Sequence, residues 1–193
     1  FKDIKAIGWY VDMYNRAQIS INFNKYKSST IHDVFDEACA LATERGLRIT
    51  GSELVGLIPL EALIMAGRHY LKKQNRSTGV PEKMIVETAI QSLGLSDVTP
   101  FDPDEKIIDF AVRKDANDLI QFTLNDFVEE LGSNSPAPGG GSVSALCGSL
   151  GAGLASMVAV LTHEKKEFID DKPKMNVLGE EAQKLKDRLL WLV

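Results

Sequence analysis

Apolar and polar residues alternate strictly over residues 17–24. The alternation sets one apolar series against one polar series: Ala17, Ile19, Ile21 and Phe23 against Gln18, Ser20, Asn22 and Asn24. A period of two predicts a strand with an apolar core face and a polar face. Residues 7–11 show the same alternation, so they predict a partner strand, with residues 12–16 as the hairpin loop.

The next apolar positions follow helical spacing. Thr30 and Asp33 form a capping-box pattern that opens a helix, and Gly46 marks its end. Residues 47–49 predict a third strand, interrupted by Gly51 and Gly56. Further helices are expected over 60–73 and 81–93, with a short one after Pro103. This order predicts an α+β fold, a sandwich of ferredoxin-like character with helices on one face of the sheet.

The pattern changes after residue 112. Residues 113–121 have the composition of a linker, and no strand pattern follows them. Helices are expected over 123–131, 143–162 and from Pro173 onward. The last helix repeats apolar residues at 3-4 spacing, which predicts a bundle seam: Met175, Leu178, Ala182, Leu185, Leu189 and Leu192. We therefore predict two domains, at 1–112 and 122–193, the second being the first helices of an all-α bundle.

A run of glycines leads into the 143–162 helix. Gly139, Gly140, Gly141 and Ser142 follow two prolines, so the helix starts with unpaired amide groups at the positive end of its dipole. Such an entrance suits a phosphate or a carboxylate. It is not a Walker A loop, because no Lys-Ser/Thr pair follows. The alternative is a flexible connector without a ligand.

The helix after the glycines is uncharged and rich in small residues. Residues 134–162 are long enough to cross a membrane, but the many serines and glycines make a poor lipid-facing surface, so we expect no membrane span. Small residues recur every four positions in two series: Ser144, Gly148, Ala152 and Ser156, and Ala145, Ser149 and Gly153. This spacing predicts a tight bundle or an oligomer interface.

Two further groups of residues are candidates for ligand binding. Gln18 and Asn22 on the polar strand face could line a cleft, or that face could simply meet solvent. Ser52 and Glu53 lie between two glycines, where backbone often approaches a ligand closely. A structural bulge with Glu53 in solvent is the competing interpretation.

The remaining composition excludes several classes of protein. The net charge is −5 and no basic stripe is present, which argues against nucleic-acid binding. His32, His69 and His163 are isolated and lack metal-ligand spacing, so we expect no metal. The two cysteines lack CxxC spacing and no signal peptide is seen, so a cytoplasmic location is expected.

Three motifs together resemble a known enzyme family. The segment from Ser135 to Ser142 and the small-residue helix resemble the start of the cyclodeaminase/cyclohydrolase domain of folate enzymes. Gly8-Trp9-Tyr10, residues 17–22 and residues 50–59 resemble the C-terminal subdomain of glutamate formimidoyltransferase. The order of the motifs is similar to that of the bifunctional formimidoyltransferase-cyclodeaminases.

The resemblance implies folate one-carbon chemistry without a metal. A formimino group would pass from N-formimino-L-glutamate to tetrahydrofolate, and cyclodeamination would give 5,10-methenyltetrahydrofolate and ammonia. From the polar strand face, the glycine-bounded segment and the glycine entrance, we infer that folate would contact Gln18, Asn22, Ser52, Glu53, Gly139, Gly140, Gly141 and Ser142. The resemblance also implies that the catalytic groups of both reactions lie outside these 193 residues, so this chain alone is expected to be inactive.

Alternatives remain open for the function. The second part could be a non-catalytic helical module for assembly, with the glycine loop as a hinge. It could instead be a cyclohydrolase-like domain joined to the transferase. In either case the small-residue helix leads us to expect a homo-oligomer.

Overall fold

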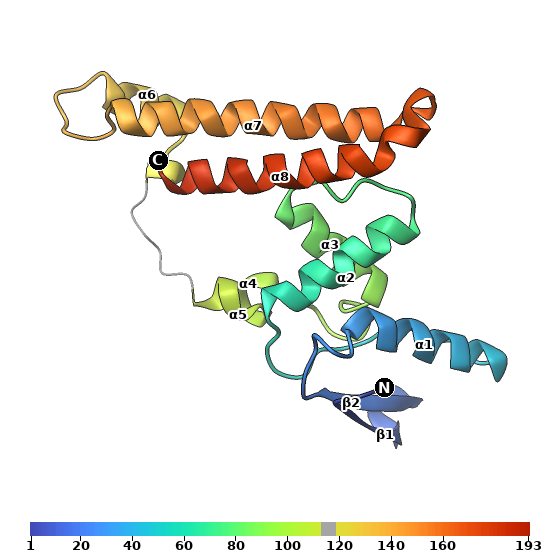
Figure 1. Ribbon diagram of the computed structural model, residues 1–193. Coiled ribbons are helices and arrows are strands. Elements are labelled where there is room, and N and C mark those ends of the chain that lie inside the picture. Colours follow the sequence, from blue (N-terminus) through green and yellow to red (C-terminus); the bar gives the residue numbers. More distant parts are fainter. Residues whose placement is uncertain (113–118) are drawn as a thin grey trace. The chain divides into compact units, whose positions relative to one another are not determined.

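The chain begins with an antiparallel hairpin (Figure 1). In the computed structural model, which describes residues 1–112 and 119–193, β1 spans Ile4–Val11 and β2 spans Arg16–Phe23. A short 3-10 turn, η1 at Asp12–Tyr14, joins them. The register pairs Ile4 with Phe23 and Val11 with Arg16. The predicted hairpin is confirmed, and with the helices that follow it confirms the α+β class.

Neither face of the hairpin is buried as the alternation predicted. Ile19, expected in a core, is 55% exposed, whereas Ile21 and Phe23 of the same series are half-buried. Gln18 and Ser20 on the polar face are also half-buried, and the Gln18 amide contacts Glu53. The described part of the sheet has two strands, and each of its faces is partly covered.

The predicted helices of the first part form with their expected ends. α1 spans Ile31–Glu44, and the amide of Asp33 donates to the Thr30 hydroxyl at its start. α2 spans Leu60–Lys73 and α3 spans Glu82–Leu93. Gly94 after α3 has φ +62°, the left-handed conformation that favours glycine. Two short helices follow, α4 at Pro103–Lys106 and α5 at Ile108–Ala111.

The predicted third strand at 47–49 is wrong. Residues 47–57 form no strand, and their backbone instead meets the end of α3. The amide of Ser52 donates to Gly94 O at 3.0 Å, and its hydroxyl donates to Leu93 O. The hydrogen bonds of Ser52 are thus made to the end of a helix, and the segment pairs with no strand in the described structure. A single parallel bridge, Ile58 to Ile107, follows.

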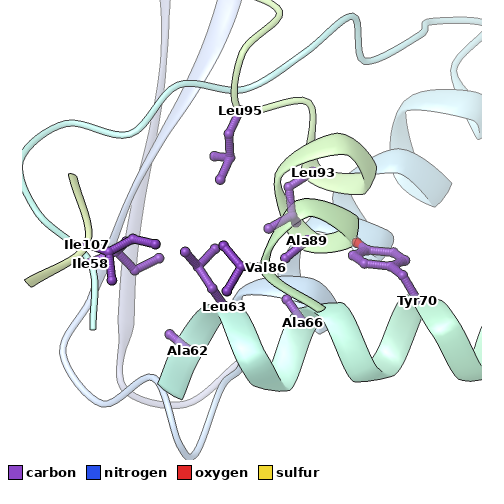
Figure 2. Close-up of a cluster of buried hydrophobic side chains, with 10 residues drawn as sticks. All are labelled: Ile58, Ala62, Leu63, Ala66, Tyr70, Val86, Ala89, Leu93, Leu95 and Ile107. Atoms are coloured by element: carbon purple, nitrogen blue, oxygen red, sulfur yellow. The ribbon is translucent and has the colours of Figure 1, made fainter. Parts of the chain in front are cut away.

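The core of the first part lies between α2 and α3. Figure 2 shows the apolar side chains of the two helices facing one another. The buried cluster comprises Ile58, Ala62, Leu63, Ala66, Tyr70, Val86, Ala89, Leu93, Leu95 and Ile107. Leu63 and Ile107 are fully buried in it. Burial of these side chains is the main stabilising contribution to this part.

The chain divides into two compact units. The first comprises Phe1–Tyr70 and Val86–Val112, and the second comprises Leu71–Ile85 with the described residues from Leu119 onward. Part of the predicted linker, residues 113–118, lies outside the described residues. Besides the end of α2 and the start of α3, the described part of the second unit contains η2 at Leu119–Gln121, α6 at Leu124–Leu131, α7 at Gly140–Glu164, η3 at Lys166–Asp171 and α8 at Lys172–Trp191.

α7 and α8 form a long antiparallel pair (Figure 1). The buried stripe of α7 alternates small residues at 4-3 spacing and ends on a histidine: Ala145, Ser149, Ala152, Ser156, Ala159 and His163. The Ser149 hydroxyl donates to Lys186 O at 2.9 Å, which shows how closely the backbones approach. The tight packing expected of the small residues is therefore present, with a stripe drawn from both predicted series.

The seam predicted for α8 is only partly correct. Leu178, Leu185 and Leu192 are 56%, 51% and 54% exposed. Leu189, in contrast, packs on α7, because an added Cβ at Gly148 would lie 3.0 Å from Leu189 Cδ1, and Met175 and Ala182 are half-buried. The Gln183 amide also meets α7, where it donates to the Ser156 hydroxyl at 2.8 Å. The two helices are close together, so only part of the predicted apolar series lies between them.

α7 is long and apolar enough to cross a membrane by length and composition alone. Such a helix can equally be the core helix of a soluble protein. Ser149, Ser156 and His163 are buried against protein, and the Ser149 and Ser156 hydroxyls are hydrogen-bonded there. One face of α7 is therefore packed within the second unit.

A loop between α2 and α3 packs on this helix pair. The Ser156 hydroxyl, itself buried, donates to Gly79 O at 2.9 Å. The amide of Thr78 donates to Asn176 Oδ1 at 3.1 Å. The Thr78 hydroxyl donates to Glu180 Oε1 at 2.6 Å. These polar groups are buried and satisfied, so residues 76–81, which we call the docked loop, have a defined position within the second unit.

Acid should destabilise the second unit through His163. This side chain is 3% exposed, and its Nδ1 is buried without a hydrogen-bond partner among the described residues. Burial lowers the pKa of His163, Lys172 lowers it further, and Glu164 opposes them. The unfolded chain therefore takes up the proton first, and stability is lost as the pH falls below about 6.5. We expect urea unfolding of α7 and α8 between pH 7.5 and 5 to show a smaller pH dependence in His163→Gln than in the parent chain. An identical dependence in both proteins would contradict this assignment.

Candidate functional site

Two of the predicted site residues meet in the first unit. Gln18 on β2 and Glu53 in the irregular segment are 35 positions apart in the sequence, and the Gln18 amide donates to Glu53 Oε1 at 2.9 Å. Both side chains are half-buried. The hairpin and the glycine-bounded segment therefore bring together an amide and a carboxylate, as a binding cleft would require.

Two aromatic residues complete this cluster. The indole N–H of Trp9 on β1 donates to Gln18 Oε1 at 2.7 Å. The Tyr14 hydroxyl lies 3.4 Å from Glu53 Oε2. Burial raises the pKa of Tyr14, and the Glu53 charge raises it further, so the phenol stays protonated and donates. Trp9, Tyr14, Gln18 and Glu53 form what we call the Glu53 cluster.

The Glu53 cluster suits a flat ring that carries N–H donors. Glu53 keeps unused lone pairs on a carboxylate that its neighbours hold in place, and a carboxylate accepts two parallel hydrogen bonds readily. Trp9 is 53% exposed although its N–H is bonded, so its ring offers an open aromatic surface beside the carboxylate.

Sequence patterns did not identify the roles of Trp9 and Tyr14. Trp9 was expected only as a strand residue, and Tyr14 lies in the hairpin loop. The GWY motif at residues 8–10 was the available signal, since an exposed tryptophan on a hairpin is unusual for a purely structural role.

The other two predicted residues of this part lie apart from the cluster. Asn22 is exposed and pairs across the hairpin with Lys5. The Ser52 hydroxyl and amide both bind the end of α3, so Ser52 anchors the segment that presents Glu53. A ligand role for these two residues remains a prediction.

Gly51 permits a close approach within the protein. Its φ is +155°, and an added Cβ would lie 2.6 Å from Asp97 Cβ. A pocket of about 360 Å³ lies beside it, with Arg48, Asp97 and Gly94 among its lining residues. The interrupted segment therefore borders a hollow, as a ligand-binding segment would, but the glycine itself serves a contact with the loop after α3.

The glycine entrance of α7 is open. Gly139 is the N-cap, and Gly139, Gly140 and Gly141 are all exposed. An added Cβ at any of the three would meet no atom within 4 Å. Helix geometry leaves the first amides of α7 without an acceptor in the helix. The Ser142 hydroxyl, in contrast, donates to Val193 O at 2.8 Å.

His32 and His69 are not isolated, which corrects the sequence-based expectation. Their ring centroids are 4.4 Å apart, and His69 Nε2 lies 2.9 Å from Asp36 Oδ2. Burial lowers the pKa of His32, and the neighbouring His69 lowers it further. The two histidines come from different helices, so no local spacing could have revealed the pair.

Comparisons with known proteins match both parts of the chain. A family model described as the formiminotransferase domain matches residues 1–113, and one described as formiminotransferase-cyclodeaminase matches residues 123–193. The formimidoyltransferase-cyclodeaminase of Dictyostelium discoideum is 46% identical over 170 residues, covering 86% of this chain and 32% of that protein.

Other relatives match all or part of the same region. The formimidoyltransferase-cyclodeaminase of Sus scrofa is 40% identical over 169 residues, covering 86% of this chain and 31% of that protein. A methenyltetrahydrofolate cyclohydrolase of Methylorubrum extorquens is 34% identical over 71 residues, covering 37% of this chain and 34% of that protein. The chain thus spans about a third of the length of these curated relatives.

Proposed function

The chain belongs to the formiminotransferase-cyclodeaminase family, and from that membership we propose that it forms part of a bifunctional enzyme that uses tetrahydrofolate. In this proposal the whole protein transfers a formimino group from N-formimino-L-glutamate to tetrahydrofolate. It then cyclises the product to 5,10-methenyltetrahydrofolate and releases ammonia. The domain limits at 1–112 and 122–193 and a cytoplasmic location remain predictions.

The Glu53 cluster is the observation that carries the folate proposal. The pterin ring of folate is flat and presents adjacent N–H donors on one edge. Glu53 accepts from such an edge, Gln18 and Tyr14 hold its carboxylate in place, and Trp9 offers its ring face. The chain's contribution is to bind and orient the folate, which lowers the barrier by holding the reacting nitrogen in position.

The open entrance of α7 supports a separate, anionic site in the second unit. Gly139, Gly140 and Gly141 place unobstructed amides at the positive end of a 25-residue helix. A carboxylate of the folate glutamate tail is the matching group. Because Ser142 binds Val193 through its hydroxyl, its part in this proposal is limited to its amide.

Replacing Glu53 with glutamine tests the folate site. The amide keeps the shape of the side chain but turns one acceptor into a donor, so we expect 5-formyltetrahydrofolate to bind at least about tenfold more weakly in calorimetry. Glu37→Gln is the matched control, because Glu37 is exposed on α1, and it should leave the affinity unchanged. Equal affinities for the parent chain and Glu53→Gln would refute the role of Glu53.

Titration with 5-formyltetrahydrofolate also distinguishes a folate enzyme from a non-catalytic assembly module. Exposed apolar residues on α7 favour the assembly module, since Leu150, Leu154 and Val158 are 60%, 60% and 58% exposed. Such a face supports the proposal of a homo-oligomer. A chain that assembles but binds no folate would favour assembly as the function of these residues.

A further inference from the structure

Two helices of the first unit bring together four polar side chains that the proposed folate chemistry does not use. His32, Asp33 and Asp36 lie in the first half of α1, and His69 lies near the end of α2. One ligand atom from each of His32, Asp33 and His69 can be chosen so that all three lie within 4.8 Å of one another. From this geometry we propose that His32, Asp33 and His69 bind one divalent transition-metal ion, with zinc(II) as the best match.

The donor set is the first argument for zinc. Two imidazoles and one carboxylate suit a borderline-soft ion with a fourth, open position, and they do not suit calcium or magnesium, which prefer oxygen ligands. Together with Asp36, the group holds two carboxylates beside two imidazoles. A dication would offset the negative charge of these carboxylates.

The side chains are held in place before any ion binds. The Thr30 hydroxyl donates to Asp33 Oδ2 at 2.6 Å while it caps α1, which fixes the carboxylate. Asp36 holds one nitrogen of His69 at 2.9 Å, and the His69 ring lies edge-on to Tyr70 at 5.0 Å. A carboxylate on one nitrogen of a ligating histidine is the common arrangement in metal sites, because it leaves a lone pair on the other nitrogen.

His32 supplies an independent observation. This side chain is 8% exposed, and its Nδ1 is buried without a hydrogen-bond partner in the described structure. Burying an imidazole nitrogen without a partner costs free energy, and so does holding two imidazole rings 4.4 Å apart if both are charged.

The proposed ion would tie α1 to α2. The expected consequence is structural, because the site joins two helices of the first unit and is independent of the folate proposal. Binding to the folded state alone raises its stability by mass action. Zinc should therefore raise the melting temperature of the chain, and magnesium at the same concentration should not.

Calorimetry with zinc chloride on the untagged 193-residue chain tests the site. We expect about one zinc ion per chain and, in His69→Gln, an affinity lower by more than about tenfold. His69 is the residue to change because its side chain is 31% exposed, so the variant should fold. Circular dichroism of His69→Gln checks that it does.

His163→Gln provides the matched control, since it removes a histidine of the second unit and should keep full zinc affinity. A second variant, Asp33→Asn, should also weaken zinc binding. If the parent chain binds no zinc, or if His69→Gln binds it as tightly as the parent, the proposal is wrong. An affinity lost equally in His163→Gln and His69→Gln would also overturn it.

Discussion

Leu63→Ala should destabilise the first unit by about 4 kcal/mol, the largest effect expected of a single substitution in this chain. Leu63 is completely buried, with 0% of its surface exposed to solvent, in the α2–α3 cluster. Truncation to alanine removes its transfer free energy and leaves a cavity. Figure 2 shows Val86 close beside Leu63, where that cavity would open.

The measurement should report on the first unit specifically. Hydrogen exchange of the α2 and α3 amides should accelerate strongly in Leu63→Ala, and the urea midpoint of the same amides should fall. Leu124→Ala is the control, because Leu124 is 78% exposed and the same truncation there should cost under about 1 kcal/mol. Similar losses in the two variants would show that Leu63 is not at the centre of a packed core.

Gly79→Ala should displace the docked loop from α7 and α8. A Cβ on Gly79 would lie 2.6 Å from Gly179 Cα and 2.8 Å from Gly179 C, both backbone atoms of α8. Backbone cannot yield as a side-chain tip does, so the loop or the helix must move. We expect a loss of about 3 kcal/mol, since overpacking of this kind strains the backbone and opens the hydrogen bond from Ser156 to Gly79 O.

The same chemical change should have the opposite effect on stability at an open position of α7. Gly151→Ala adds a methyl group with no atom within 4 Å, inside a helix, so it should stabilise α7 by up to about 1 kcal/mol. The pair can be compared by thermal melting and by exchange of the Thr78 amide, which donates to Asn176. If Gly79→Ala has the melting temperature of the parent and its Thr78 amide exchanges at the same rate, the contact between Gly79 and Gly179 does not constrain the loop.

Local signals predicted most element boundaries because they act over a few residues. The Thr30 and Thr123 hydroxyls accept hydrogen bonds from the amides three positions on, as their capping patterns indicated. Gly46 and Gly94 adopt positive φ just after helices, where glycine removes the steric cost. The period of two predicted the hairpin for the same reason, since strand geometry alone imposes it.

The failures all concern partners distant in sequence. Residues 47–49 have strand composition, but a strand needs a neighbouring edge, and the Leu47 amide donates to Ala42 O at the end of α1 instead. Leu178 has perfect seam spacing and is nevertheless 56% exposed, whereas Leu189 packs against Gly148 of α7, because burial depends on what the partner helix presents at each position. Gln18 and Glu53 were both selected as candidates, but their contact depends on how the hairpin meets a segment 35 positions away.

By itself, the sequence determined the helices, the hairpin, the open glycine entrance and the family, because each rests on local geometry or on shared motifs. The tertiary structure alone decided which faces became buried and which polar groups met. It paired His32 with His69, gave Glu53 its donors and seated the docked loop against Gly179. These contacts depend on the positions of whole helices, and those positions follow from burial and close packing over the entire unit rather than from any short stretch of chain.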